Sequence, residues 1–295
     1  MGNLLKSFFF KLSKDIVFRV IMFVGIGLAL FSAGLLALLD LFAADLVDGA
    51  EVGMKFCSGP SMLLLSLSPA QNFGIIVPIC VVIFVASEFT QGTIRNKIIG
   101  GYSKTYIFCS LFLSGLILAG ILVGIYVGTS TLLGLIFGGF DLSEPVFMLN
   151  LVSVAPVDGK YLGFSILLNL LAYVSLISFA LFLATAFRSV GPCIPIIILT
   201  IIFLPVVVQI FKAIDAVTDS ETFTTVMKYI NPLYAATSGT KTINEVYFAE
   251  GGVYERVIGV EYPTDTLIAG IVNNLAYSGI FFGFGCWMFS ARDVK

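Results

Sequence analysis

Six long apolar runs confine this chain to folds that cross a lipid bilayer. A transmembrane helix needs about 20 consecutive, mostly apolar residues, and backbone polar groups inside lipid must be satisfied within helices or closed barrels. The runs cover residues 18–39, 71–87, 106–137, 163–187, 190–211 and 267–289. We therefore expect an all-α integral membrane protein with six transmembrane helices, built as one membrane domain over residues 1–295.

The composition leaves little room for a soluble catalytic domain. Hydrophobic residues make up 58% of the 295 residues and charged residues only 12%, whereas soluble domains are about 25% charged. The chain has no histidine, which removes the commonest metal ligand and general base, and it has no HExxH or GxSxG motif. We expect no catalytic residue, no metal site and, at a net charge of -2, no nucleic-acid partner.

The second and third runs predict irregular spans. The second is the shortest, and its helix could begin earlier, near residues 62–67, with Pro69 and Pro78 bending it. The third is longer than the hydrocarbon core requires, so we expect it to tilt or to project beyond the membrane.

Charged residues are distributed unequally between the two sides that six spans would create. If both termini are cytoplasmic, the inner segments hold ten of the 16 Lys and Arg residues and three of the 18 Asp and Glu residues. Cytoplasmic segments of membrane proteins carry an excess of Lys and Arg. We therefore predict cytoplasmic N- and C-termini and an acidic outer side.

The first 15 residues predict an amphipathic helix on the inner leaflet. Apolar residues recur at helical spacing with lysines between them, which suits a surface of anionic headgroups. The apolar positions are Leu4, Leu5, Phe8, Phe9 and Leu12, and the lysines are Lys6, Lys11 and Lys14. A signal peptide or a simple charged flank is the alternative, although the following apolar run is too long for the apolar region of a signal peptide.

The expected outer loops cover residues 41–70, 138–162 and 212–266. The largest, 212–266, contains the turn signal Asn231-Pro232 and the segment GGVYERVIGVEYPTD, whose alternating pattern predicts a hairpin. Cys57 lies in the first, polar loop, whereas the other four cysteines lie in apolar runs as small hydrophobes. No disulfide framework or zinc site is indicated.

The polar stretch 88–105, between the second and third spans, predicts a short cytoplasmic helix. Its residues are helix-compatible until Gly100 and Gly101 end the helix. One side would rest on the membrane domain, and the other would meet a cytoplasmic partner. The expected apolar face consists of Ile94, Ile98 and Ile99, and the positions expected to point elsewhere are Gln91 and Arg95. In the alternative interpretation, the stretch is a solvated loop whose cations serve only as topology signals.

The sequence EFTQGTIRNKIIGGYSKTYIFCS resembles the hallmark of permease subunits of type-2 ABC exporters, in the branch of bacterial peptide- and antibiotic-export or resistance systems. The N-terminal helix, the six spans, the long third span and the NPL sequence fit the same family, but the 212–266 loop is longer than usual for it. The resemblance implies a coupling helix at 88–105 that docks into an ATPase subunit. The residues implied to couple are Glu88, Gly92, Thr93, Ile94, Arg95 and Lys97.

The resemblance also implies a function and partners. The chain would be the permease subunit of an ATP-driven exporter in the bacterial plasma membrane, and it would move an amphipathic peptide, antibiotic or lipid-like substrate. Two copies of an ATPase subunit would bind ATP and Mg²⁺, and a second copy or a related permease would pair across the first and fifth spans. Lys104-Thr105 lacks the glycine loop of a phosphate cradle, so this chain would bind no cofactor and would not itself be an enzyme.

Polar residues and glycines inside the spans give weaker signals. Asn169, Tyr173, Asn273 and Asn274 could line a polar passage or form interhelix hydrogen bonds. The spans lack charged residues near their middle, which disfavours an ion-coupled carrier. Glycine stripes are expected to pack neighbouring helices of one chain, at Gly120, Gly124 and Gly128 and at Gly279 and Gly283.

A second class of function fits the same features. The chain could be a membrane sensor or scaffold whose acidic outer loops bind a cationic ligand, such as an antimicrobial peptide. An intramembrane enzyme would be a third class, but the sequence offers it no plausible catalytic groups. The presence or absence of an ATPase partner separates the first two classes.

Overall fold

The computed structural model describes residues 2–46, 56–142, 146–148, 153–155, 157–218, 221–249 and 252–291. Six of its helical segments are long and apolar enough to cross a membrane, so the prediction of six spans is confirmed. These segments are Ile16–Phe42, Phe73–Thr90, Lys104–Gly138, Gly159–Phe187, Val190–Thr218 and Thr264–Ala291. By the length and composition of these helices, the chain is a multi-pass membrane protein.

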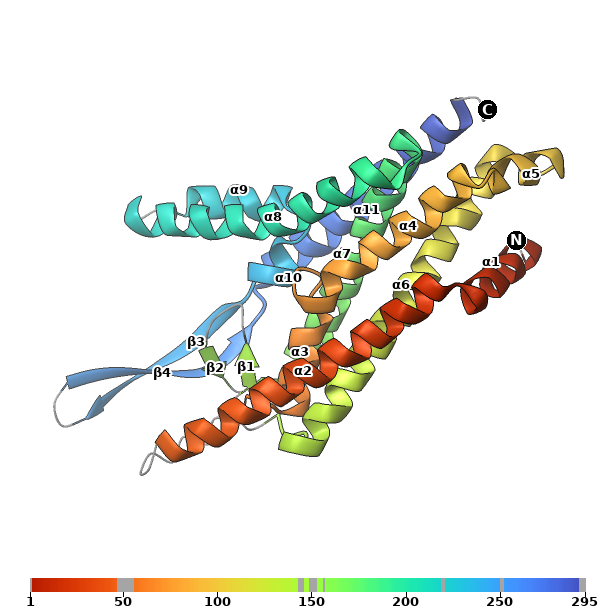
Figure 1. The fold of residues 1–295 in the computed structure, drawn as a ribbon. Coiled ribbons are helices and arrows are strands. Elements are labelled where there is room, and N and C mark those ends of the chain that lie inside the picture. The colour runs from red at the N-terminus through yellow and green to blue at the C-terminus, as the bar shows by residue number, and fades with distance from the viewer. Residues whose placement is uncertain are drawn as a thin grey trace.

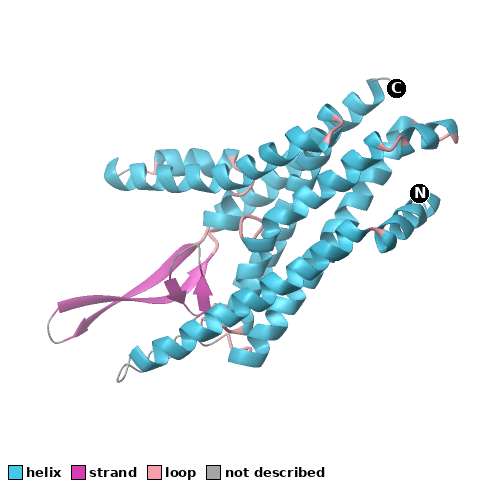
Figure 2. Cartoon of the chain, viewed as in Figure 1, coloured by secondary structure: helices cyan, strands magenta, loops and turns pink. Residues whose placement is uncertain are grey.

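The elements follow one another along the chain as helices interrupted by two short pairs of strands (Figure 2). They are α1 (Gly2–Lys14), α2 (Ile16–Leu46), α3 (Gly59–Leu67), η1 (Asn72–Ile75), α4 (Ile76–Thr90), α5 (Thr93–Ile99), α6 (Lys104–Gly138), β1 (Val146–Met148), β2 (Ser153–Ala155), α7 (Gly159–Phe187), α8 (Val190–Thr218), α9 (Thr222–Ile230), α10 (Tyr234–Ser238), β3 (Lys241–Ala249), β4 (Gly252–Glu261) and α11 (Thr264–Ala291).

The bundle has two different ends (Figure 1). One end carries α5, the N-terminus of α1 and the C-terminus of α11, and we call it the α5 end. The other end carries β1 to β4, and we call it the strand end. Most of the cations assigned to the inner side lie at the α5 end, but Arg292 and Lys295 lie outside the described residues. The strands add two small antiparallel sheets to an otherwise helical chain, so the all-α prediction holds for the spans alone.

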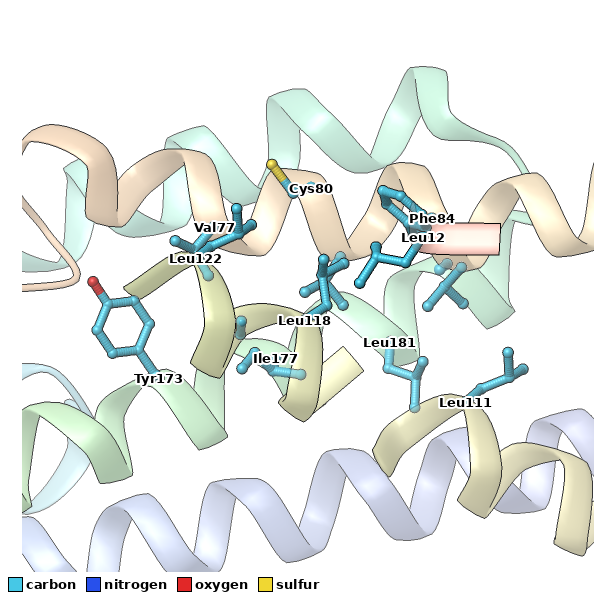
Figure 3. Packing of buried hydrophobic residues seen from close by; sticks show 14 of the residues in the cluster. Leu12, Val77, Cys80, Phe84, Leu111, Leu118, Leu122, Tyr173, Ile177 and Leu181 are labelled. Carbon is cyan, nitrogen blue, oxygen red and sulfur yellow. The ribbon is translucent and has the colours of Figure 1, made fainter. Parts of the chain in front are cut away.

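Helices α4, α6 and α7 form the centre of the bundle. In the most apolar 18-residue window of each of these helices more than half of the residues are buried, whereas in α2, α8 and α11 about a fifth are buried. The central core is almost entirely aliphatic and aromatic, and it reaches from α7 to α1 (Figure 3). The labelled members are Leu12, Val77, Cys80, Phe84, Leu111, Leu118, Leu122, Tyr173, Ile177 and Leu181. In lipid, such packing is held by van der Waals contacts rather than by the hydrophobic effect.

The second span is broken, as its prolines predict. Helix α3 ends at Leu67, and a turn with Pro69 separates it from η1 and α4. Pro78 lies in the first turn of α4, where a missing amide donor is tolerated, so only Pro69 marks the break. Gly74 closes the turn tightly, because a Cβ on it would lie 2.4 Å from the Ser68 carbonyl oxygen.

Helix α3 is pressed against the end of α6. A Cβ on Gly138 would lie 2.1 Å from the Cys57 carbonyl oxygen, so no larger residue fits there without movement of the backbone. The Asp40 carboxylate of α2 holds the same segment, because it accepts the backbone N–H groups of Phe56 and Cys57. Cys57 is fully buried, and its thiol donates to the Ala33 carbonyl. Cys57 therefore lies in a loop, as predicted, but its side chain is buried in that loop.

The predicted 212–266 loop is mostly regular structure. Helix α8 continues to Thr218, and α9 follows it, with its first amides held by the Asp215 carboxylate, which accepts from Phe223 and Thr224. The β3 and β4 strands form an antiparallel hairpin that projects from the strand end (Figure 1). The predicted hairpin segment supplies only the second strand of this hairpin, because β3 comes from the preceding residues.

The glycine stripes do not pack against other helices of the chain. Among the described residues, no atom lies within 4 Å of a Cβ placed on Gly120, Gly124 or Gly128. These three glycines instead line an open apolar groove of about 800 Å³ beside α3 and α7. Gly279 and Gly283 also meet no described atom. Both packing predictions are wrong, because the stripes lie on faces of α6 and α11 that point away from the core.

We predict that Gly138→Ala destabilises the protein. The new methyl group would overlap the Cys57 carbonyl, and such overpacking costs about 1–3 kcal/mol. The matched control is Gly128→Ala, in which the methyl group meets open space and the helix gains up to about 1 kcal/mol of propensity. Thermal unfolding of the detergent-solubilised variants measures the difference, and equal melting temperatures would contradict the proposed close contact.

The Cys57 thiol should react slowly with alkylating agents. Burial, assisted by the Asp40 carboxylate, raises the pKa of the Cys57 thiol to about 11, and only the thiolate is reactive. In a variant whose single cysteine is Cys57, we expect the thiol to be alkylated slowly by iodoacetamide at pH 8. The alkylation rate should rise about tenfold per pH unit up to pH 10. Thr105→Cys at an exposed position is the control, and its rate should level off near pH 9. Equal pH profiles would refute the burial.

Candidate functional site

The candidate site is built on the buried carboxylate of Glu88, close to the end of α4. The Nζ of Lys11 donates to Oε1 at 2.8 Å, and the Nζ of Lys97 donates to Oε2 at 2.8 Å. The hydroxyl of Thr93 also donates to Oε2, at 2.6 Å. One carboxylate therefore joins three helices, α1, α4 and α5, at the α5 end.

Gly92 shapes the connection between α4 and α5. Helix α4 ends at Thr90, and Gly92 has a left-handed backbone with φ +69°, which glycine adopts at little cost. Helix α5 then begins at Thr93 and ends before Gly100, as predicted. The predicted helix 88–105 is too long, because Glu88 belongs to α4 and Lys104 begins α6.

Helix α5 has one face on the bundle and one face turned outward. Ile94 is 1% exposed within the central core, and Ile98 packs against that core. Ile99 is 74% exposed, so the prediction that it shares one face with Ile94 and Ile98 is wrong. A helical side chain five residues after Ile94 points well away from it. Arg95 and Asn96 are also exposed. The outward face consists of Arg95, Asn96 and Ile99.

Much of the predicted apolar face of α1 packs against the helix bundle. Leu4 and Leu12 are buried, and Phe8 packs against Phe84 with ring centroids 6.4 Å apart. Phe9 is exposed, and the side chain of Leu5 lies outside the described set. Lys11 is on the protein side of the helix, where it reaches Glu88.

The charges of the site do not cancel. Two lysines share one carboxylate, so the cluster of Lys11, Glu88 and Lys97 carries one net positive charge. The lysine side chains are 27% and 22% exposed, and the Glu88 side chain is 12% exposed. Ionised groups removed from water need partners, because desolvation is costly. Glu88 has three donors, whereas the two lysines share one carboxylate, and Lys11 also donates to the Ser87 hydroxyl at 3.2 Å.

Lys11 is the contributor that sequence reasoning missed. Its place in an amphipathic helix suggested a contact with lipid headgroups, and the spacing within 88–105 could not connect it with Glu88. The available signal was the carboxylate itself, since an acidic residue at the end of an apolar span requires cationic partners. The structure brings Glu88, Thr93 and Lys97 together, seats Ile94 in the core and turns Arg95 outward.

The four polar residues of the spans lie in separate contacts. The Asn274 amide oxygen accepts from the Ser175 hydroxyl at 2.9 Å, which joins α11 to α7. The Asn273 amide donates to the Lys228 carbonyl of α9. Both are interhelix hydrogen bonds, one of the two roles considered for them.

The other two polar residues belong to α7. Asn169 donates to the Ser165 carbonyl within its own helix, and Tyr173 is buried in the central core, with its hydroxyl close to Gly74. No described contact links Asn169 or Tyr173 with Asn273 or Asn274. Over the described residues, no group of three or more His, Cys, Asp or Glu side chains is arranged to hold a metal ion.

We predict that Glu88→Gln destabilises the protein more than the loss of either lysine. Removal of the carboxylate leaves two partly buried cations without a counterion, which we expect to cost about 1–3 kcal/mol after allowance for their exposure. Lys11→Gln or Lys97→Gln leaves one complete ion pair and should cost about 1 kcal/mol or less. Adding Lys97→Gln to Glu88→Gln should recover stability in thermal unfolding. A double variant less stable than Glu88→Gln would contradict this account.

Comparison with known proteins gives a family but no function. A search of the curated proteins and a search of the solved structures each found no match. A family model described as "Protein of unknown function (DUF2705)" matches residues 41–294, which is most of the chain. The match includes Glu88, Thr93, Lys97 and five of the six spans, but it begins after Lys11. The chain therefore belongs to the DUF2705 family of proteins of unknown function.

Proposed function

We propose that this chain is the transmembrane permease subunit of a bacterial ATP-driven exporter of the type-2 ABC class. In this proposal it lies in the plasma membrane with both termini in the cytoplasm. Two copies of a separate ATPase subunit bind and hydrolyse ATP with Mg²⁺, and the permease moves an amphipathic substrate, such as a peptide, an antibiotic or a lipid-like molecule, out of the cell. The chain itself catalyses no reaction.

The observation that carries the proposal is the construction of α5. A seven-residue helix stands at one end of the bundle, with its inner face anchored and its outer face exposed. The anchor consists of Ile94 in the core and of the ion pair between Lys97 and Glu88. A solvated loop that served only as a topology signal would need no such anchoring. A short helix fixed in this way can transmit a push from a cytoplasmic partner.

The outer face of α5 suits a protein partner. It combines a cation, an amide and an aliphatic side chain in Arg95, Asn96 and Ile99. Protein interfaces are enriched in Arg, and an apolar contact surrounded by polar groups is typical of them.

Contacts behind α5 connect it with the ends of several spans. Phe89 and Phe289 pack edge to face with centroids 5.9 Å apart, which joins α4 to α11. Lys104 donates to the Ser290 carbonyl, which joins the start of α6 to the same end of α11. Movement of α5 would therefore reach α1, α4, α6 and α11, as a coupled change between two states requires.

The exposed spans leave room for a second permease. In the most apolar 18-residue windows of α2 and α8, only 22% and 17% of the residues are buried within the chain. These are the first and fifth spans, the pair that the family resemblance implies at the permease interface. A second copy or a related permease on these helices would complete a membrane dimer.

We predict that the tagged chain, purified in mild detergent from its native membrane, brings an ATPase subunit with it. Arg95→Glu with Ile99→Asp should remove the ATPase from the eluate, because both side chains lie on the outer face of α5. Thermal stability should be unchanged, since neither residue is buried. Co-purification is followed by identification of the bound proteins and by an ATPase assay on the eluate.

Two further variants test the mechanism. Gly92→Pro should reduce the yield of the complex, because proline cannot adopt the φ of +69° at this position. Lys6→Glu changes an exposed cation of α1 outside the Glu88 cluster and should leave the complex intact. Recovery of the chain with a kinase, or with no ATPase, would instead favour a sensor or scaffold whose outer surface includes the β3–β4 hairpin.

A further inference from the structure

A small cavity lies beneath α1 at the α5 end. It has a volume of about 180 Å³, and α1, α4, α5 and α6 enclose it. Its walls are mainly aliphatic and aromatic, and the apolar residues that define its depth are Phe8, Val81, Phe84, Leu111 and Leu118. Apolar cavities of roughly 150 Å³ remain free of water and accept apolar molecules. The walls of this cavity therefore suit a hydrocarbon chain.

The rim of the cavity is polar and carries a positive charge. Lys11, Glu88 and Lys97 all line it, together with Ser7 and Thr93. Because the two lysines share one carboxylate, the rim can accept one more negative charge. An anion placed there would give each lysine a full counterion without displacing Glu88.

From the length and composition of the second span, we infer that the rim lies at the level of the bilayer where lipid headgroups begin. Glu88 is two residues from the end of its span at Thr90, and Lys97 follows in α5. From Glu88 the cavity extends along α4 to Val81, about 10 Å at the rise of an α-helix. One leaflet contributes about 15 Å of hydrocarbon. The cavity therefore runs from headgroup depth into the acyl region.

We propose that this cavity binds an anionic phospholipid of the surrounding bilayer, with its phosphate on Lys11 and Lys97 and part of one acyl chain between α1, α4 and α6. The lipid would join α1 to α5 from the side opposite Glu88. This site is independent of the proposed transport function, because it needs neither an ATPase nor a cargo.

Native mass spectrometry of the delipidated full-length protein tests the proposal. The probes are phosphatidylglycerol, phosphatidylcholine with the same acyl chains, and glycerol phosphate. Phosphatidylglycerol should bind about fivefold more tightly than phosphatidylcholine, which corresponds to one lysine at an anionic headgroup. Glycerol phosphate should neither bind nor compete, because it has no chain to fill the cavity. Equal binding of the two lipids would overturn the proposal, and competition by glycerol phosphate would reduce it to a simple anion site.

Variants distinguish the contribution of the charged rim to lipid binding from that of the apolar cavity. Ser114→Leu would place a larger side chain in the cavity wall and should abolish tight binding of both lipids, with the rim left intact. Lys11→Gln should lower phosphatidylglycerol binding to the level of phosphatidylcholine. Lys6→Gln on the same helix is the control, because Lys6 is exposed and lies outside the cavity lining.

Two results with these variants would contradict the site. One is wild-type lipid binding by Ser114→Leu, and the other is an equal loss of phosphatidylglycerol binding in Lys6→Gln and Lys11→Gln. If Lys11→Gln does not fold, Ser114→Leu and the comparison of the two lipids on the unmodified protein still decide the question.

Discussion

The carboxylate of Glu88 is the interaction on which the arrangement at the α5 end depends. It is bound by Lys11 of α1 and by Lys97 and Thr93 of α5. Without it, two cations would face each other at this end of the bundle, and α1 would keep its apolar contacts and the hydrogen bond from Lys11 to Ser87. The spans themselves pack through apolar side chains, so this ion-pair cluster provides directional contacts at a position where packing alone would allow the short helices to slide.

A sequence of this kind predicts its spans well and their contacts poorly. Spans follow from hydrophobicity over about 20 residues, and the Pro69 break and the Gly100 end of α5 follow from local backbone chemistry. The partner of Glu88 could not be predicted, because Lys11 lies 77 residues away and its direction depends on how α1 packs. Ile99 was misplaced for a related reason: a helix of two turns leaves little periodicity from which to assign a face.

The 212–266 segment and the glycine stripes show a second limit. Hydrophobicity marked 212–266 as a loop, yet Asp215 of α8 caps a helix there by accepting amides from α9, an interaction that depends on how α8 and α9 lie beside each other. The glycines of α6 looked like packing residues because small residues often bring helices together. The sequence periodicity is the same for a glycine stripe that packs against a helix and for one that faces an open groove. For the glycines of α6, the positions of α3 and α7 determine which of the two occurs.

The break at Pro69 separates α3 from the second span. Helix α3 is held at the end of α6 by the close backbone approach at Gly138, whereas α4 carries Glu88 and leads to α5. A continuous helix would act as a rigid lever and would carry a tilt at one membrane surface directly to the other. Here the turn at 68–71 can absorb part of that tilt. The long helices α6 and α7, which contact both α3 and α4, are therefore unbroken routes between the two ends of the bundle.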